Sequence, residues 1–218
     1  MQLHDLKITQ KNYKDLFCTG TNISKQQLEV FSYKTTPHFS IATAVRISGG
    51  VPLYFTPIAL DDSLQKIKQG DTTSYINYYV DGGMICNYPI SMFDSCRHGH
   101  MPLLCNDLIF NPATIGIKLE RKAQIDTFLN NSIEIPPYNP KKMSDYLSAF
   151  TNLLTETMAR KYPGIKNEQG RSIYVDYGAM SPKVKKVSIK TKRILYDNGK
   201  EGALQFFELH KKNIVHVK

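Results

Sequence analysis

An apolar, aromatic run at residues 75–80 ends abruptly in Asp81-Gly82-Gly83, and this junction constrains the fold more than any other part of the sequence. A short apolar run that stops at glycine is typical of a buried strand. The strand would carry an acidic side chain at its carboxyl end, on a turn that glycine makes easy to form. We therefore predict a sheet in which one strand delivers a carboxylate to the sheet's end.

Further strand candidates lie on both sides of this junction. Residues 15–20 and 28–33 are rich in apolar and β-branched side chains, and the polar turn between them predicts a pair of strands. Residues 114–119 and 171–177 are two more candidates. Strands separated by helical stretches indicate a layered α/β sheet.

Three helices are expected. The first spans residues 41–47, with Ser40 as its N-cap and Ser48-Gly49-Gly50 as its stop. The last spans residues 192–210, where Gly199 and Gly202 suggest close packing of the helix backbone onto the sheet. Between them an apolar stripe at helical spacing is interpreted as core packing; it comprises Met143, Tyr146, Leu147, Phe150, Leu153, Leu154 and Met158.

Two segments before the junction are not expected to form central strands. Pro52 and Pro57 interrupt residues 51–58, so this segment is predicted to be an ordered loop or an edge segment. Residues 61–73 are polar and are expected to form an exposed excursion.

The composition is that of one globular domain spanning residues 1–218, with 41% hydrophobic and 22% charged residues. No apolar run is long enough to span a bilayer, and the N-terminus lacks the pattern of a signal peptide. We expect a cytoplasmic or peripheral membrane location, and the compartment itself stays open.

The chain is basic, with a formal net charge of +9 and an isoelectric point near 9.3. Part of the excess lies in the last third, at Lys183, Lys185, Lys186, Lys190, Lys192, Arg193, Lys211, Lys212 and Lys218. A solvated face is the first interpretation, and contact with an anionic membrane is the second. No RNA-binding motif or helix-turn-helix signature accompanies the charge, so a nucleic acid partner is not expected.

The cysteines Cys18, Cys86, Cys96 and Cys105 form no CxxC pair, and we expect reduced, mostly buried thiols. A zinc site is the alternative for one loop, whose metal-capable residues are Cys96, His98, His100 and Cys105. Their spacing matches no structural zinc pattern. Neither a metal nor another cofactor is therefore expected.

Two segments together are the most specific feature of the sequence. The first runs from Ala42 through Arg46-Ile47-Ser48-Gly49-Gly50 to Pro57, and the second from Tyr79 through Asp81-Gly82-Gly83 and Asn87-Tyr88-Pro89 to Ile90. In this pattern the sequence resembles the patatin-like phospholipase family. The resemblance identifies Asp81 with the acid of that family's serine–aspartate dyad.

The resemblance extends to Phe31-Ser32-Tyr33, to Thr114-Ile115-Gly116 and to residues 198–203. It implies the C-terminal portion of a three-layer α/β domain, with a parallel or mixed sheet flanked by helices. The family's glycine-rich DGGGxRG loop and its GxSxG nucleophile motif are both absent from the sequence. Ser48 is a poor substitute, because it lacks the glycine two positions earlier that a nucleophile elbow uses.

Asp81 itself has two interpretations. A carboxylate at the end of a buried strand can act as a base toward a serine, with Gly82 and Gly83 leaving room for the alcohol. Alternatively, the side chain caps its own turn. Asn87 and Pro89 are expected to shape this turn.

Other candidates lie close to these motifs in the sequence. Arg46 could pair with a carboxylate at the site or touch a lipid phosphate, although a salt bridge on the helix surface is favoured. Tyr54, Phe55 and Tyr88 could line an acyl-chain pocket, although core packing is favoured.

Three functional hypotheses follow. In the first, the chain is part of a longer lipid acyl hydrolase, of the phospholipase A or lysophospholipase type, that acts on phospholipid or another lipid ester. In the second, a separate N-terminal half or protein activator completes the site. In the third, the chain is a non-catalytic remnant that binds an anionic membrane or a protein. In all three, this chain by itself is expected to be inactive, because the nucleophile is missing.

Overall fold

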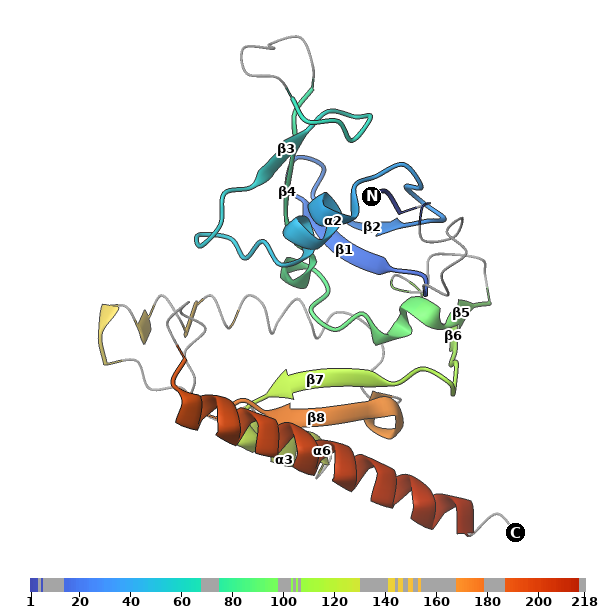
Figure 1. The fold of residues 1–218 in the computed structure, drawn as a ribbon, viewed down its shortest axis with the longest axis vertical. Helices are drawn as coiled ribbons and strands as arrows, with labels where there is room; N and C mark the ends of the chain where they lie inside the picture. Colours follow the sequence, from blue (N-terminus) through green and yellow to red (C-terminus); the bar gives the residue numbers. More distant parts are fainter. Residues whose placement is uncertain are drawn as a thin grey trace. The chain divides into compact units, whose positions relative to one another are not determined.

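The structure is a computed structural model, and it describes residues 1–3, 5, 14–67, 75–97, 103, 105, 107–129, 141–143, 145–146, 149–150, 153, 168–178 and 187–215. The chain divides into two compact units. Unit 1 comprises Met1–Tyr88 and Phe150–Tyr162, and unit 2 comprises Pro89–Ala149 and Pro163–Lys218. Within the described residues the fold is mixed α/β (Figure 1).

Unit 1 is built on a four-stranded sheet in the order β2-β1-β4-β3. The strands are β1 (Phe17–Asn22), β2 (Gln27–Ser32), β3 (Ile58–Leu60) and β4 (Asn77–Asp81). The expected pair at residues 15–20 and 28–33 is confirmed as the β1–β2 hairpin. Segment 51–58 leads into β3, which lies at the sheet edge, as its prolines indicated.

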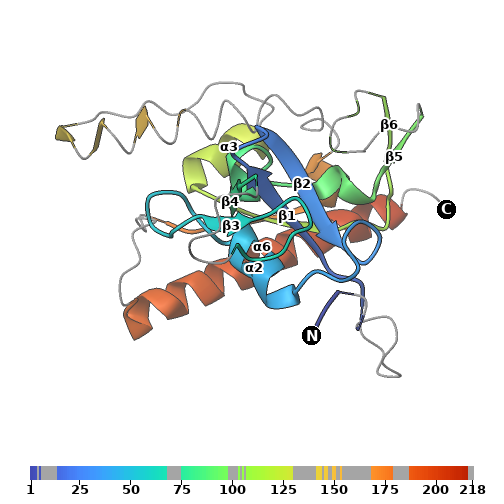
Figure 2. The ribbon, with the colours of Figure 1, turned by 90° about the horizontal axis from the view of Figure 1, so that it is seen from above.

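Helix α2 (Ile41–Ser48) lies along β1, as Figures 1 and 2 show. The predicted N-cap is confirmed, because the Ser40 hydroxyl accepts a hydrogen bond from the Thr43 N–H at 3.4 Å. The hydrophobic core lies between the helix and the sheet. Its buried members are Leu3, Cys18, Phe31, Phe39, Ala44, Ile47, Leu60 and Tyr79.

The sheet of unit 1 differs from the expected parallel or mixed sheet, since each of its pairings is antiparallel. Burial alternates along part of β4: Tyr78 is 45% exposed, whereas Tyr79 is 2% exposed. Antiparallel sheets commonly leave one face to solvent, and period-two alternation results. The aromatic run of residues 75–80 concealed this alternation, because both faces of the strand carry tyrosine.

The described residues of unit 2 form two short sheets. Strands β5 (Ser95–Cys96) and β6 (Leu108–Ile109) pair antiparallel, and β7 (Gly116–Glu120) and β8 (Ser172–Asp176) pair parallel. The latter two confirm the strands expected at residues 114–119 and 171–177. Helices α3 (Lys122–Leu129) and α6 (Ile189–Val215) both contact β8.

Helix α6 includes the helix expected at residues 192–210, and it packs closely onto β8 at Gly202. A Cβ atom at Gly202 would overlap the backbone carbonyl of Tyr174, so the predicted close approach is confirmed there. At Gly199 the nearest atom to such a Cβ lies 3.9 Å away, which is ordinary contact. Only one of the two glycines is therefore required by packing.

The apolar stripe at residues 143–158 is not core packing where the structure describes it. Met143, Tyr146, Phe150 and Leu153 are helical, and their side chains are 81%, 59%, 47% and 57% exposed. Leu147, Leu154 and Met158 lie outside the described residues. Helical spacing identifies an apolar face, but it does not show whether another element covers that face.

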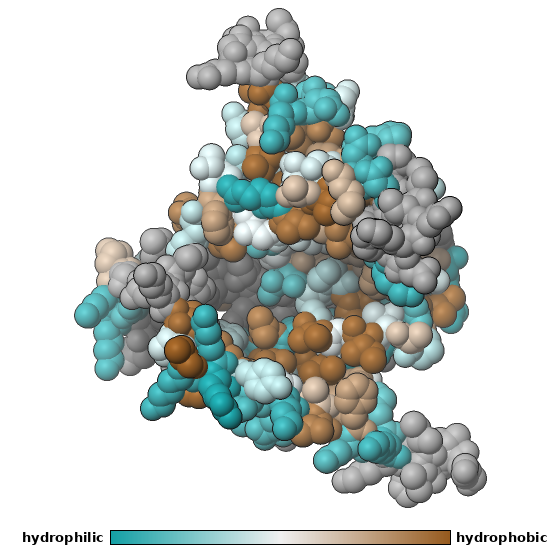
Figure 3. Space-filling model, viewed as in Figure 1, coloured by the Kyte–Doolittle hydropathy of each residue, from teal (hydrophilic) through white to brown (hydrophobic). Residues whose placement is uncertain are grey.

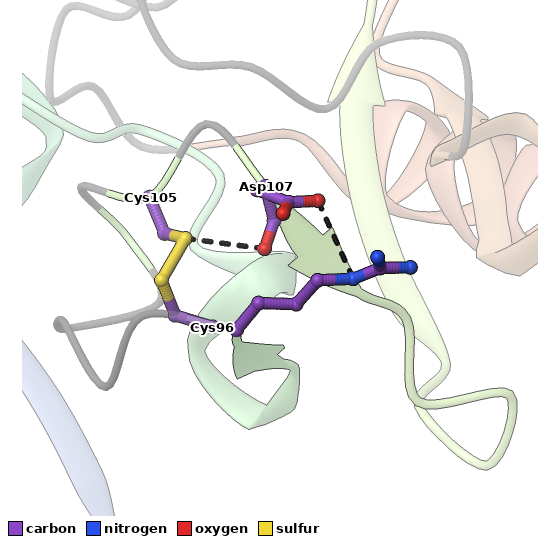
Figure 4. The surroundings of a disulfide bond; sticks show 4 residues. Cys96, Cys105 and Asp107 are labelled. Carbon is purple, nitrogen blue, oxygen red and sulfur yellow. Dashed lines mark hydrogen bonds and ion pairs between the residues drawn. A yellow bond between two sulfur atoms is a disulfide. The ribbon is translucent and has the colours of Figure 1, made fainter.

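The cysteine prediction is wrong for one pair, because Cys96 and Cys105 form a disulfide, with their Cα atoms 5.9 Å apart (Figure 4). The β5–β6 pairing sets Cys96 opposite Leu108, which brings the two cysteines together. Sequence spacing does not reveal this pairing. Cys18 and Cys86 are buried and reduced, as expected, and burial raises the pKa of Cys18.

The described residues include no group of three or more His, Cys, Asp and Glu side chains placed to hold a metal ion. His98 and His100 of the alternative zinc loop lie outside them. Within the same part of the chain, no helix has the length and apolar character needed to cross a bilayer.

Candidate active site at the end of β4

Asp81 is the last residue of β4, and its backbone is held from two sides. Its N–H donates to the Gly50 carbonyl at 3.1 Å, just after α2. Its own carbonyl accepts from the Thr21 hydroxyl of β1 at 2.9 Å. The position of Asp81 is therefore set by the sheet and by the segment that ends α2.

The Asp81 side chain is half-buried and caps its own turn. Its Oδ1 accepts a hydrogen bond from the Gly83 N–H at 2.8 Å, at the start of the 3₁₀ helix Gly82–Met84. Burial raises the pKa of Asp81, and the Gly83 N–H opposes part of that shift. No cation of the described residues forms an ion pair with this carboxylate. The capping interaction is thus present, and Oδ2 is left without a hydrogen-bond donor from that part of the chain.

The turn glycines have different roles. A Cβ atom at Gly82 would overlap the side chain and backbone of Thr19, so no larger residue fits without a shift of β1. A Cβ atom at Gly83 would lie 3.0 Å from the Asn87 Oδ1 and 3.2 Å from the Asp81 Oδ1. Gly82 is required by packing, whereas Gly83 leaves open the space beside the carboxylate.

Gly20 is a further residue of the site that the sequence analysis missed. It faces Asp81 across the β1–β4 ladder. A Cβ atom there would lie 2.6 Å from Cγ2 of Ile47 and 2.8 Å from the Phe31 ring. Glycine at this position therefore lets α2 lie close to the strand next to Asp81. An isolated glycine inside a strand pattern is the only sequence signal for such an approach.

A buried polar network braces β4 behind Asp81, and the sequence analysis also missed it. The Tyr79 hydroxyl donates to Glu29 Oε2 at 3.0 Å, and burial raises the pKa of Tyr79. Asn22 donates to Glu29 Oε1 at 2.8 Å and to Asn77 Oδ1 at 3.1 Å, and both asparagines are 0% exposed. Polar side chains alone do not show in sequence which of them will be buried together.

The aromatic candidates next to α2 are at the surface. Tyr54 is 50% exposed and Phe55 is 40% exposed, so the favoured core-packing interpretation is wrong for both. Tyr88 is partly buried. Arg46 lies over the Phe55 ring, 5.0 Å from its centroid, and forms no ion pair with another described residue.

Comparison with known proteins bears on this same region. Residues 4–94 match the family model described as patatin-like phospholipase. A probable lipid hydrolase of Invertebrate iridescent virus 6 is 30% identical over 83 residues, which cover 38% of this chain and 24% of that protein. An uncharacterized protein of Acanthamoeba polyphaga mimivirus is 33% identical over 81 residues, which cover 37% of this chain and 23% of that protein.

Among solved structures, VipD from Legionella pneumophila is similar with a TM-score of 0.47 and 19% identity, over 96% of this chain and 35% of that one. The chain spans about a quarter of the length of the curated relatives it matches. The match to the family includes β4 and Asp81. Residues 4–94 of this chain are therefore similar to the patatin-like phospholipases.

Proposed function

We propose that this chain is a partial patatin-like domain, the C-terminal portion of a three-layer α/β fold, and that it supplies the dyad aspartate, Asp81, to a lipid acyl hydrolase. The supporting observation is the half-buried Asp81 carboxylate at the end of β4 within the segment that matches the family. The substrate class is a phospholipid or another lipid ester. The serine comes from a polypeptide segment outside these 218 residues, because the sequence contains no GxSxG motif.

In the reaction, the Asp81 carboxylate accepts the proton of the serine hydroxyl while the serine oxygen attacks the ester carbonyl. The Gly83 N–H holds Oδ1 at 2.8 Å, which fixes the orientation of the carboxyl group and leaves Oδ2 to meet the hydroxyl. A free aspartate is a weak base at neutral pH. Burial raises the pKa of Asp81, and this makes the carboxylate a stronger base toward the hydroxyl.

Gly82 and Gly83 serve this role in different ways. Gly82 lets the chain turn against Thr19, and Gly83 keeps a side chain away from the carboxylate. The ester C–O bond then breaks, and the proton held by Asp81 passes to the departing alcohol oxygen, which leaves the acyl group on the serine. When water attacks the acyl-serine, Asp81 accepts a proton from the water and returns it to the serine oxygen as the acid is released. The donors that stabilise the oxyanion belong to the glycine-rich loop, which this sequence also lacks.

The role of Asp81 can be tested by grafting. Residues 1–94 of this chain would replace the matching segment of the iridescent virus relative, and ester hydrolysis would be measured with a chromogenic lipid ester. The graft with Asp81 should hydrolyse the ester, and Asp81→Asn should abolish hydrolysis. Asp61→Asn is the control, since Asp61 also caps a turn, through the N–H groups of Ser63 and Gln65. An active graft whose rate is unchanged by Asp81→Asn would contradict the role.

A second candidate function is a non-catalytic binding module, and it is supported by a separate feature, the exposed face of α6. In that case the chain would bind a membrane whether or not a serine is supplied. Two results together would favour this function. The chain would bind vesicles, and it would support no hydrolysis even when mixed with a polypeptide that carries the GxSxG serine.

A further inference from the structure

Helix α6 is much longer than the sheet that it covers. Its 27 residues extend about 40 Å, whereas the 5 residues of β8 extend about 17 Å. The buried side of the helix contains Phe206, with Ala203 packed beside it against Ile173 and Val175 of β8. Much of the remaining helix surface therefore faces solvent.

One solvent-facing stripe of α6 has an unusual composition. Its members recur every three or four residues, which places them along one side of the helix. They are four apolar or aromatic residues and three cations: Ile189, Arg193, Tyr196, Lys200, Leu204, Phe207 and Lys211. We call these seven residues the α6 stripe.

The side chains of the α6 stripe are exposed along its whole length. The exposed fraction is 86% for Ile189, 71% for Tyr196, 53% for Leu204 and 51% for Phe207. No ion pair links Arg193, Lys200 or Lys211 to another described residue. Figure 3 shows hydrophilic and hydrophobic side chains next to one another along α6.

Acidic residues border the stripe on one side. Asp197 lies four residues after Arg193, and Glu208 lies four residues after Leu204 and three before Lys211, so both are neighbours of stripe members. Three of the seven stripe residues are cations. Large apolar and aromatic side chains lined up with cations along one side of a helix are typical of a helix that lies on a lipid surface.

We propose that the α6 stripe docks on an anionic lipid surface. The apolar and aromatic side chains would enter the headgroup and acyl boundary, while the arginine and lysines reach outward to the lipid phosphates. Charge complementarity supports this occupant, because three of the seven stripe residues are cations and the chain has a net charge of +9. The docking does not depend on Asp81 or on a serine.

The first experiment measures sedimentation of the full chain with phosphatidylcholine vesicles, with and without phosphatidylserine. Binding should require phosphatidylserine and should weaken as salt rises, because surface charges are screened. Equal binding to both kinds of vesicle, or no binding to either, would overturn the proposal. Asp81→Asn should bind as the unmodified chain does, which separates this test from that of the proposed catalytic role.

A charge-matched pair of variants locates the surface. The stripe variant is Arg193→Glu, Lys200→Glu and Lys211→Glu; the control is Lys34→Glu, Lys66→Glu and Lys142→Glu, at exposed lysines elsewhere. Each lowers the net charge from +9 to +3. The stripe variant should lose about a hundredfold in vesicle affinity, and the control less than about tenfold. Equal losses would show that overall charge, not the stripe, drives binding.

Insertion of the stripe can be read by fluorescence, because the sequence has no tryptophan. Phe207→Trp should give an emission shift to shorter wavelength on vesicles with phosphatidylserine. Gln205→Trp, an exposed position off the stripe, should not shift. Circular dichroism checks that both variants keep the helix. The proposal would be overturned if a duplex oligonucleotide displaced the chain from vesicles and the emission of Phe207→Trp did not shift on vesicles. The stripe would then be assigned to nucleic acid.

Discussion

The same five-residue pattern occurs once in each unit, as Tyr79-Val80-Asp81-Gly82-Gly83 and as Tyr174-Val175-Asp176-Tyr177-Gly178. Both aspartates end a strand, and each accepts a hydrogen bond from the N–H two residues later. The distance is 2.8 Å from Gly83 and 2.7 Å from Gly178. Local sequence thus produced the same aspartate cap twice.

The surroundings of the two turns differ. At Gly82 the backbone of β1 leaves no room for a side chain, whereas the equivalent Tyr177 projects its hydroxyl to accept from Arg121 Nε at 3.0 Å. Gly178 has a φ of +64°, with open space around it. The first turn is constrained by packing against neighbouring strands, and the second by its own backbone conformation. The pattern of aspartate and glycine therefore cannot by itself identify a catalytic acid.

The largest difference between the two turns is expected in hydrolysis. In a mixture of this chain with a polypeptide that carries a patatin-like GxSxG serine, Asp81→Asn should lower the rate about a thousandfold or more. Asp176→Asn should leave the rate within about twofold, because its turn lies outside the family-matched segment. Equal effects of the two substitutions on the rate would remove the functional distinction between the turns.

The next effect concerns the buried ion pair of the second unit. Arg171 precedes β8 and donates to both carboxylate oxygens of Asp94, at 2.6 and 2.9 Å. The Asp94 side chain is 0% exposed, so Arg171→Ala would leave a buried carboxylate unpaired. Urea denaturation should show a loss of about 3–5 kcal/mol in the free energy of unfolding.

The control for this loss is the exposed pair formed by Lys25 and Asp62 in unit 1, with Nζ and Oδ1 2.9 Å apart. Lys25→Ala should cost far less unfolding free energy than Arg171→Ala, because solvent screens the pair. A similar cost for Lys25→Ala and Arg171→Ala would show that burial does not set the strength of these pairs.

Smaller effects on stability are expected at Gly82 and Gly178, one glycine from each turn. Gly82→Ala should cost about 1–3 kcal/mol of unfolding free energy, since its Cβ would overlap Thr19. Gly178→Ala should cost about 1–2 kcal/mol through its positive φ alone. Asparagine, which tolerates that conformation, should recover stability at position 178 but not at position 82. Recovery at both positions would mean that backbone conformation limits both turns.

The smallest effect is a pH dependence of stability. Burial raises the pKa of Asp81, so the folded state binds this proton more tightly than the unfolded state does. The resulting stabilisation of the folded state is fully present below the ordinary aspartate pKa of 3.8, and it is lost as pH rises through the raised pKa of the folded state. Asp81→Asn keeps an acceptor for the Gly83 N–H but does not titrate. Its unfolding free energy, relative to that of the unmodified chain, should rise across this window.

The rate of hydrolysis should also depend on the ionisation of Asp81, but it should rise with pH where the stabilisation falls. The rate should rise with pH as Asp81 ionises, with its acid limb above 3.8. A rate profile whose acid limb lies at or below that value would contradict the burial of the working carboxylate.

The sequence by itself determined the local features of this protein. The Ser40 cap, the β1–β2 hairpin, and the Asp81 turn depend on neighbours in the chain, so residue type and spacing were enough to predict them. The family resemblance around Asp81 rested on the same local patterns, and the match over residues 4–94 confirms it.

Only the tertiary structure decided which surfaces are covered. It paired Cys96 with Cys105, made the sheet of unit 1 antiparallel, and left the apolar faces at Met143 and on α6 exposed. It also distinguished Gly82, which Thr19 crowds, from Gly199, which has room. Each of these depends on residues distant in sequence, and neither hydrophobic spacing nor a glycine reports which distant element will lie against it.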